Sequence, residues 1–211
     1  MIRWSKATMP IALALVLAAC GGGEQKEGDQ MDTSKAPPPP DIGNMTPHVV
    51  LETNMGTIVM ELDREKAPKS AESILYHVEN GFYDGLTFHR VMPGFMIQAG
   101  GFTPDLMQRQ SNSPPVQNEA TNGLKNTRGT IAMARTPDPH SANAQFFINL
   151  VDNDFLNFTS ETQQGWGYAV IGHVVEGMDI VDAVAAAPTH TVGRMDDVPV
   201  EVVVIEKAYV R

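Results

Sequence analysis

Short runs of β-forming residues, separated by residues that favour turns, constrain the fold of this chain more than any other feature. Val, Ile, Phe, Tyr and Thr gather in these runs, and Gly, Pro and Asn are common between them. The predicted strands are residues 49–51, 57–62, 86–92, 95–99, 130–134, 146–150, 168–175 and 200–210. Their number and spacing predict a mainly β domain whose antiparallel sheet closes into a barrel or sandwich.

Two stretches have helical spacing instead. Residues 68–80 place apolar side chains three and four positions apart, begin with proline and end before Gly81, which are typical helix boundaries. Residues 178–185 repeat the apolar spacing over a shorter length. Since only two helices are expected, a doubly wound parallel sheet is not predicted.

The first twenty residues have the pattern of an export signal. Arg3 and Lys6 precede an apolar run at residues 9–19, which is shorter than the roughly 20 residues that a membrane-spanning helix needs. Residues 17–20, Leu-Ala-Ala-Cys, resemble the lipobox of bacterial lipoproteins. The resemblance implies that residues 1–19 are a signal peptide and that Cys20 carries a lipid. The alternative is an ordinary signal peptide followed by an unmodified cysteine.

The segment after the cysteine has the composition of a tether. Residues 20–47 contain little apolar periodicity and four consecutive prolines, which is typical of a disordered, partly stiff spacer. The proline run is alternatively a ligand for a polyproline-binding module. Gly21 is not the aspartate that resembles an inner-membrane retention signal, so we expect a lipid anchor in the outer rather than the inner membrane, facing the periplasm. Residues 48–211 form the predicted domain, expected to be monomeric.

Charge and cysteine content exclude several classes of partner. The formal net charge is −10, without the clustered Lys and Arg that bind phosphates, so no nucleic-acid partner is expected. The single cysteine excludes an intrachain disulfide and a metal site built from several thiolates. Six histidines lack metal-ligand spacing. We therefore expect neither a metal nor another cofactor.

One segment combines a charged side chain with many apolar ones. Residues 88–102 read FHRVMPGFMIQAGGF, with Arg90 inside an aromatic-rich strand. Strand alternation places Met96 and Gln98 on one face, and in residues 145–149 it places Gln145 and Phe147 on one face and the intervening apolar residues on the other. This mixture favours a shallow binding groove. The alternative is an arginine on the outside of a barrel whose apolar residues fill the interior.

Several long blocks closely resemble the cyclophilin family. They are FHRVMPGFMIQAGGF at 88–102, NEATNGLKNTRGTIAMART at 118–136 and SANAQFFIN at 141–149. Two further blocks, VDNDFLNF at 151–158 and QGWGYAVIGHVVEGMDIVD at 164–182, are similar to the bacterial B-type branch. The resemblance extends from His48 to the C-terminus. It implies a closed eight-stranded antiparallel barrel capped by two α-helices, with a peptidyl-prolyl cis-trans isomerase groove on its outer face.

The resemblance also assigns roles to residues. It implies that Arg90 is catalytic and that Gln98 braces it. The residues that it implies bind the substrate are Phe95, Met96, Phe147 and Leu156 in the proline pocket, Ala134, Arg135 and Thr136 along the extended peptide, and Gln145, Phe155 and Tyr168 around the groove. Phe155 replaces the tryptophan of cyclosporin-sensitive members, so we expect weak binding of that drug. Strand alternation points His89 away from Arg90 and gives it a structural role.

The expected reaction is rotation about X-Pro bonds in unfolded or extended segments of exported proteins. Two other readings of the sequence remain. The first is a non-catalytic envelope lipoprotein that uses the same groove as a holdase or adhesion factor. The second is a structural envelope lipoprotein, in which groove substitutions leave peptide binding unchanged.

Overall fold

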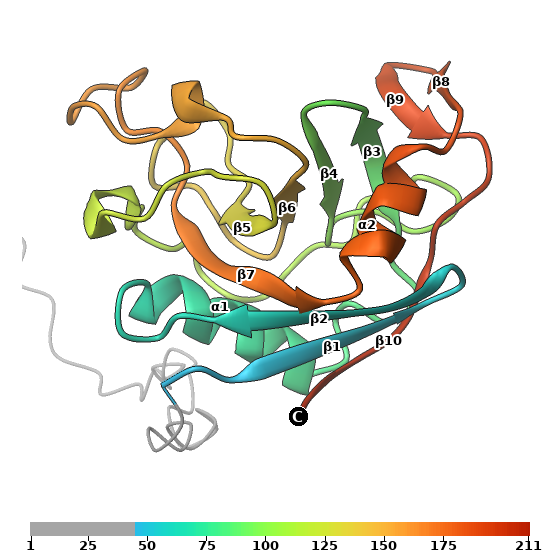
Figure 1. Cartoon of the computed structure of the whole chain (residues 1–211), viewed down its shortest axis with the longest axis horizontal. Coiled ribbons are helices and arrows are strands. Elements are labelled where there is room, and N and C mark those ends of the chain that lie inside the picture. The colour runs from blue at the N-terminus through green and yellow to red at the C-terminus, as the bar shows by residue number, and fades with distance from the viewer. Residues whose placement is uncertain (1–44) are drawn as a thin grey trace, which may run out of the picture. The chain divides into compact units, whose positions relative to one another are not determined.

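Eight strands form one curled antiparallel sheet in the computed structural model, which describes residues 45–211 (Figure 1). In spatial order the strands are β10 (Ile205–Val210), β1 (His48–Thr53), β2 (Gly56–Leu62), β7 (Val170–Glu176), β5 (Thr130–Met133), β6 (Phe146–Asn149), β4 (Met96–Ala99) and β3 (Phe88–Met92). The predicted strands lie within two residues of these, except the last. The mainly β prediction is confirmed.

The two helices are also where the spacing predicts them. Helix α1 (Pro68–Glu79) buries Ala71, Ile74, Leu75 and Val78 on one face, and its first residue is proline. Helix α2 (Met178–Ala185) buries Val181 and Val184. The apolar stripe of each helix therefore covers part of the core that the sheet leaves open.

The main core lies between the concave side of the sheet and the helices. Alternate residues of the β1–β2 hairpin, among them Leu51, Ile58 and Met60, enter it together with the fully buried rings of Tyr83 and Phe146. At the start of the described residues, the Pro47 carbonyl accepts a hydrogen bond from the Leu62 amide at 3.0 Å. Among the described residues, hydrogen bonds to the sheet thus include Pro47, one residue before the predicted boundary at His48.

The sheet is curled, but its end strands β10 and β3 are not neighbours in the ladder. An isolated bridge joins Thr87 and Val204, which precede these two strands, and the Phe88 amide donates to the Val203 carbonyl at 2.9 Å. The eight-stranded antiparallel sheet and its two helices are thus confirmed. Complete closure of the barrel stays a prediction.

A second, two-stranded sheet corrects the prediction of one long strand at residues 200–210. That stretch is a strand only over β10, while the residues before it form a hairpin of β8 (Thr189–Val192) and β9 (Met195–Pro199). Gly193 has a positive φ of 62°, which a tight turn between the two strands requires. Strand β9 lies against β3.

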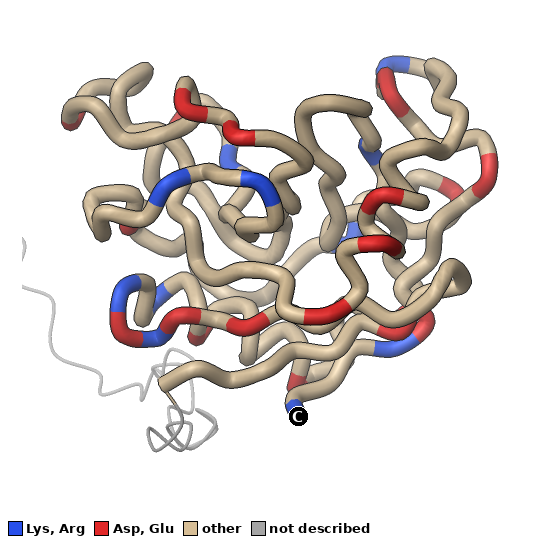
Figure 2. The backbone as a smooth tube through the Cα atoms, in the orientation of Figure 1, with Lys and Arg blue, Asp and Glu red and all other residues tan. Residues whose placement is uncertain are grey.

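The surface of the described part carries both signs of charge. Lys and Arg are scattered among Asp and Glu along the backbone, without a continuous basic stripe (Figure 2). Among residues 45–211, none of the helices is both long enough and apolar enough to cross a membrane. The predicted signal peptide, Cys20 and all but the last three residues of the predicted tether lie outside the described residues.

Candidate functional site

Arg90 lies on β3 with its side chain 44% exposed. Its neighbours His89 and Val91 are buried on the opposite side of the strand, as alternation predicts. The pairing of β3 with β4 shifts register between Phe88 and Arg90, so Phe88 also enters the main core. The buried side chains of Phe88, His89 and Val91 thus hold β3 in place, while the Arg90 guanidinium stays at the surface.

Arg90 belongs to a row of side chains that crosses four strands. It pairs with Gln98 of β4, Gln98 pairs with Phe147 of β6, and Phe147 pairs with Ala132 of β5. Residues directly opposite each other on antiparallel strands project to the same face of the sheet. The sheet therefore places a cation, an amide and an aromatic ring side by side on its convex face.

An apolar cluster separate from the main core lies on this face. Its buried members are Met96, Ala132, Phe147, Leu156 and Val170. Half-buried residues pack against it, namely Met92, Phe95, Leu124, Ala134 and Tyr168. Six of these ten are residues that the sequence assigns to substrate binding. The sequence did not assign the other four to the site. Met92, Ala132 and Val170 lie on this face of strands β3, β5 and β7, and Leu124 lies in an adjoining loop.

Aromatic contacts hold the walls of this cluster. Phe147 and Tyr168 meet edge to face, with ring centroids 5.6 Å apart and planes at 78°. Phe95 and Phe155 stack with centroids 5.6 Å apart, and Phe155 is 74% exposed. Phe155 is thus a rim residue rather than a buried part of the pocket.

Three buried asparagines, which the sequence reasoning missed, hold the loops around the cluster. Asn153 donates to the Asn149 side chain at 2.8 Å and to the Phe95 carbonyl at 3.0 Å. Asn149 donates to Asn126 at 3.2 Å, and Asn126 donates in turn to the Tyr168 carbonyl at 3.2 Å. Buried amides that satisfy one another fix backbone positions. The signal was present as Asn-rich loops between strands, but their burial could not be read from the sequence.

No side-chain hydrogen bond joins Gln98 to Arg90, the residue that Gln98 is predicted to brace. Gln98 lies opposite Arg90, but its amide donates to the Gln145 side chain at 2.9 Å. Within residues 45–211 the Arg90 guanidinium makes no hydrogen bond, and its ionic partner is Asp197, with Nε and Oδ2 3.5 Å apart. The bracing role of Gln98 therefore has no direct contact behind it in this structure.

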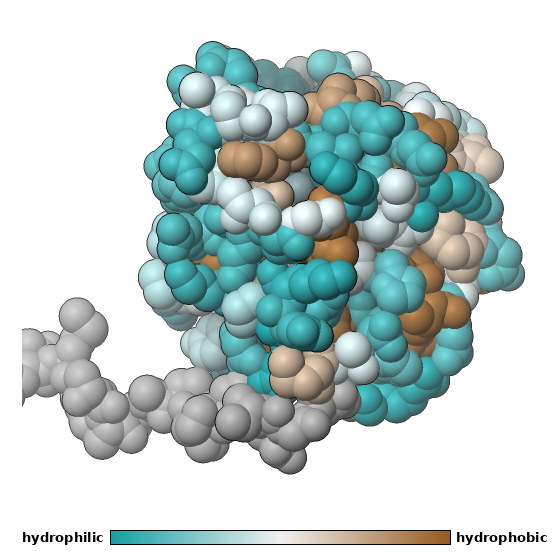
Figure 3. All heavy atoms as spheres, turned by 60° about the vertical axis from the view of Figure 1, so that its left-hand side comes forward, coloured by the Kyte–Doolittle hydropathy of each residue, from teal (hydrophilic) through white to brown (hydrophobic). Residues whose placement is uncertain are grey.

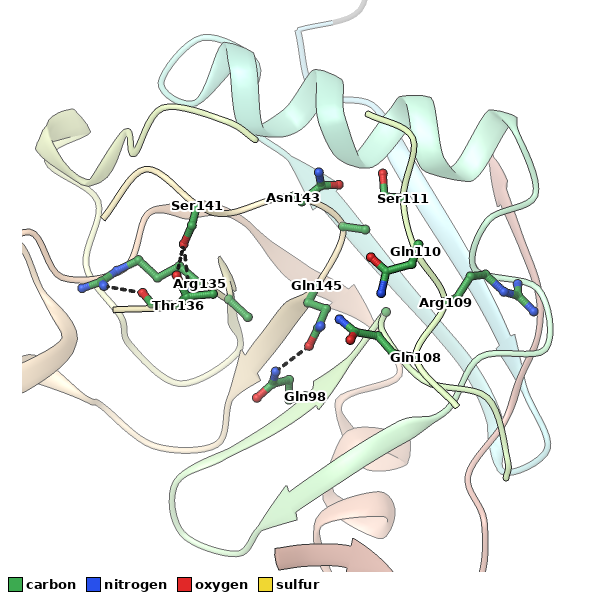
Figure 4. A pocket seen from close by; sticks show the side chains of 13 residues that line it. Gln98, Gln108, Arg109, Gln110, Ser111, Arg135, Thr136, Ser141, Asn143 and Gln145 are labelled. Carbon is green, nitrogen blue, oxygen red and sulfur yellow. Dashed lines mark hydrogen bonds between the residues drawn. The ribbon is translucent and has the colours of Figure 1, made fainter. Parts of the chain in front are cut away.

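Beside the cluster lies a polar cavity of about 270 Å³ (Figure 4). Five predicted site residues line it, namely Gln98, Ala134, Arg135, Thr136 and Gln145. Most of its other side chains are amides and hydroxyls, including those of Gln108, Gln110, Ser111, Ser141 and Asn143. One face of the molecule is largely hydrophilic, with apolar patches between polar groups (Figure 3). The cavity suits a side chain that forms hydrogen bonds.

Arg135 directs its charge away from that cavity. Its Nε donates to the Gly167 carbonyl at 2.9 Å, and its guanidinium lies 4.6 Å from the centre of the Tyr168 ring. A cation over an aromatic face is attracted by the ring quadrupole. The Arg135 side chain thus holds Tyr168 against the apolar cluster.

The backbone at residues 134–136 is partly available. The Ala134 amide donates to the Gln145 carbonyl, and the Thr136 amide donates to the Ser141 hydroxyl, each at 2.9 Å. Within the described part of the chain, the Arg135 amide and carbonyl form no hydrogen bond. Arg135 can therefore pair with an extended peptide through its main chain, while its two neighbours are already engaged.

His89 is buried behind Arg90 and stays neutral near pH 7. Burial lowers its pKa to about 4, the nearby backbone of Thr87 opposes this, and the positive charge of Arg90 adds to it. Its ring lies tilted against Phe102, with centroids 4.6 Å apart. This environment fits the structural role predicted for it. No three His, Cys, Asp or Glu side chains of the described residues come close enough together to hold a metal ion.

Comparisons with known proteins agree with this geometry. The family model for cyclophilin-type peptidyl-prolyl cis-trans isomerases matches residues 48–210. The isomerase cyp18 of Streptomyces antibioticus is 58% identical over 160 residues, covering 76% of this chain and 96% of the relative. Isomerase B of Escherichia coli K12 is 54% identical over 162 residues, covering 77% of this chain and 98% of the relative.

Solved structures share the fold. A cyclophilin-type isomerase of Cryptosporidium parvum superposes with a TM-score of 0.64 at 23% identity, covering 79% of this chain and 98% of that one. The same protein has also been solved in the presence of the dipeptide Ala-Pro, and that structure superposes equally well. From the match over residues 48–210 and the identity to its bacterial relatives, the chain belongs to the cyclophilin-type peptidyl-prolyl cis-trans isomerases.

Proposed function

We propose that Arg90 accelerates rotation about X-Pro bonds by donating a hydrogen bond to the prolyl nitrogen in the twisted transition state. Resonance gives the planar bond a barrier of about 18–20 kcal/mol, and rotation takes tens of seconds or more. As the bond twists, conjugation is lost and the nitrogen gains a lone pair. A donor that meets this lone pair binds the transition state better than either planar isomer, which is the condition for catalysis.

The row from Arg90 through Gln98 to Phe147 is the observation that carries this proposal. It sets a half-exposed guanidinium, without a hydrogen bond of its own in the described residues, beside an apolar cluster with aromatic and thioether side chains. A prolyl ring held on Phe147 and Met96 would bring its nitrogen toward the cation. The reaction requires neither a nucleophile nor a proton transfer.

The rate enhancement can be divided between the donor and the pocket. Bringing a process of tens of seconds into milliseconds needs about four powers of ten, or roughly 5.5 kcal/mol. One preorganised donor supplies about 2.7–4 kcal/mol. We assign the remainder to the apolar cluster, which holds the ring and excludes water from the amide while the preceding carbonyl swings.

The substrate that we propose is an extended, proline-containing segment of an unfolded protein. The main chain of Arg135 is available to pair with it, and the polar cavity lies next to this pairing site. The relation to a protein solved with Ala-Pro supports the choice of ligand. An amide- and hydroxyl-lined cavity favours a polar side chain upstream of the proline.

Two-dimensional NMR exchange on an Ala-Pro peptide tests the role of Arg90. We expect Arg90→Ala to lower turnover at least a hundredfold, by loss of the donor, while the amide spectrum of the domain remains that of the native fold. Arg194→Ala, which removes an exposed charge at the turn of the β8–β9 hairpin, is the control and should leave turnover unchanged. Near-normal catalysis by Arg90→Ala would contradict the mechanism.

The same experiment separates catalysis from binding alone. If the chain were an envelope holdase or adhesion factor that uses this groove, peptide binding would persist and the wild-type chain would not accelerate exchange. The structural-lipoprotein reading requires that substitutions at Phe147 leave peptide binding unchanged. The outcomes for wild type, Arg90→Ala and a Phe147 variant, with peptide binding measured beside exchange, together decide between the three roles.

We further propose that the enzyme acts on exported proteins while anchored by a lipid on Cys20, in the bacterial envelope and facing the periplasm. The supporting pattern is the basic start, the apolar run at residues 9–19 and the Leu-Ala-Ala-Cys junction. Mass spectrometry of the mature protein should find Cys20 as the lipid-modified N-terminus. Cys20→Ser should abolish both the lipid and the membrane association, and an N-terminus at any other residue would contradict the proposal.

A further inference from the structure

A carboxylate from the C-terminal hairpin faces the Arg90 side chain. Asp197 of β9 places Oδ2 3.5 Å from Arg90 Nε, and the two side chains are 32% and 44% exposed. The distance and angle do not make a hydrogen bond, so the contact is ionic. Among residues 45–211, Arg90 makes no other ion pair. The contact joins β3 to β9, two strands that are far apart in the sequence.

The hairpin is built irregularly at this position. Val192 pairs with Met195 and His190 pairs with Val198, so the single residue Thr191 lies opposite both Asp196 and Asp197. Two residues opposite one is the definition of a β-bulge, and bulges beside active sites redirect a side chain. Without the extra residue, alternation would place the side chains of β9 differently with respect to β3.

The backbone of Asp197 has an unusual conformation that accompanies the bulge. Its φ is +62°, in the left-handed region, where residues other than Gly, Asn and Asp are uncommon. Its neighbour Asp196 instead accepts a hydrogen bond from the Thr191 hydroxyl at 2.8 Å within the hairpin. The two adjacent carboxylates therefore have separate partners, and only that of Asp197 is directed at β3.

We infer that Asp197 is a positioning residue for Arg90, an inference that rests on the proposed role of Arg90 in catalysis. The contact is made at Nε, at the base of the guanidinium, and it restricts the orientation of a long side chain that has no hydrogen bond of its own within the described residues. Because the contact is ionic and partly exposed, the guanidinium keeps freedom to adjust when a twisted substrate arrives. Asp197 thus prepares the donor without competing for it by a hydrogen bond.

The expected effect is modest because the pair is partly exposed. Exposed ion pairs contribute at most about 1 kcal/mol, which corresponds to about a fivefold change in rate. We therefore expect Asp197→Asn to lower kcat about two- to fivefold and to leave KM nearly unchanged. Asparagine keeps the size of the side chain and tolerates a positive φ, so the bulge should persist.

The test is NMR exchange kinetics on an Ala-Pro peptide with the full chain, together with the Arg90 Nε–H resonance. Asp197→Asn should reduce kcat, shift that resonance and speed its exchange with water. Asp196→Asn, which alters the other carboxylate of the same bulge, should change neither. Unchanged kcat and an unchanged Arg90 resonance in Asp197→Asn would overturn the inference.

A double substitution separates this inference from the proposed function. If Asp197 acts through Arg90, Asp197→Asn should cause no further loss when added to Arg90→Ala. An equal loss in both backgrounds would show that Asp197 only supports the hairpin, and would overturn the positioning role. Full activity of Arg90→Ala alone would instead refute the catalytic role of Arg90. In that case the Arg90 Nε–H resonance, compared between wild type and Asp197→Asn, still reports on the contact with Asp197.

Discussion

Stability toward acid should depend strongly on the buried His89. Its side chain is 4% exposed, and its pKa falls from an unfolded value of 6.5 to about 4 in the fold, mainly because burial disfavours the imidazolium. Between these two values the unfolded chain binds a proton that the folded chain does not. Linkage then requires that stability falls as the pH falls through this window, and that the contribution of this group levels off below about pH 4.

The size of the effect follows from the two pKa values. The lowered pKa corresponds to about 3 kcal/mol in the limit, of which about 2 kcal/mol should be lost by pH 5 and most of the rest by pH 4. Carboxylates titrate in the same range, so the wild type alone does not isolate the histidine. The comparison with a variant that cannot titrate at this position does.

Urea unfolding of wild type and His89→Gln between pH 7 and pH 4 provides the assay. A buried glutamine lowers stability at pH 7, but this offset is constant, and the variant should lose about 3 kcal/mol less than wild type on acidification. The control is His190→Gln, which replaces an exposed histidine of β8 that makes no ion pair within the described residues. Parallel curves for wild type and His89→Gln would refute the reasoning.

Two further predictions concern the sheet and the pocket. A Cβ at Gly172 would lie 2.0 Å from the Glu61 carbonyl oxygen, so Gly172→Ala should separate β7 from β2. We expect the free energy of unfolding in urea to fall by about 3 kcal/mol or more, and a loss below about 1 kcal/mol would contradict this. Phe147→Leu removes the ring that meets Tyr168 and should raise KM for an Ala-Pro peptide severalfold, whereas Phe146→Leu on the core side should lower stability without changing KM. Equal effects of the two substitutions on KM would show that Phe147 does not contact substrate.

Periodicity was enough to predict the elements that carry the site. Every second residue of a strand shares a face, so alternation along residues 145–149 predicted that Phe146 and Phe147 lie on opposite faces. In the structure Phe146 lies in the main core and Phe147 in the second apolar cluster. The family resemblance added which strands lie side by side, which no local pattern contains. Together they placed six predicted residues in one apolar cluster.

The β8–β9 hairpin could not be predicted with the same reasoning. Its strands are short and mostly exposed, so no alternation of buried and exposed residues marks them. Val192, Gly193 and Arg194 at its turn were a signal, but the valines of 200–204 suggested a longer final strand instead. The contact between Asp197 and Arg90 depends on a bulge, which shifts a strand by one residue and leaves no trace in composition.

The burial of the asparagines and the hydrogen bond between Gln98 and Gln145 could not be predicted from the sequence, for another reason. An asparagine side chain is normally solvated, and only the packing of distant segments makes Asn126, Asn149 and Asn153 bury their amides together. Gln98 had two candidate partners, the guanidinium of Arg90 on the neighbouring strand and the amide of Gln145. The choice between them depends on side-chain rotamers, which a linear pattern does not encode.

The pairing of β1 with β10 has a consequence for the order in which the chain folds. The first strand of the described residues is hydrogen-bonded to the last, from Val49 with Val210 to Thr53 with Ile205. Closing a loop over such a separation has a high entropic cost, which slows the pairing, and a nascent chain lacks the closing strand until residues 205–210 have been synthesised. Until then one side of β1 presents unpaired amides and carbonyls to any other extended chain. Loss of residues 205–211 would leave that edge of β1 open permanently and favour aggregation over a soluble, shortened enzyme.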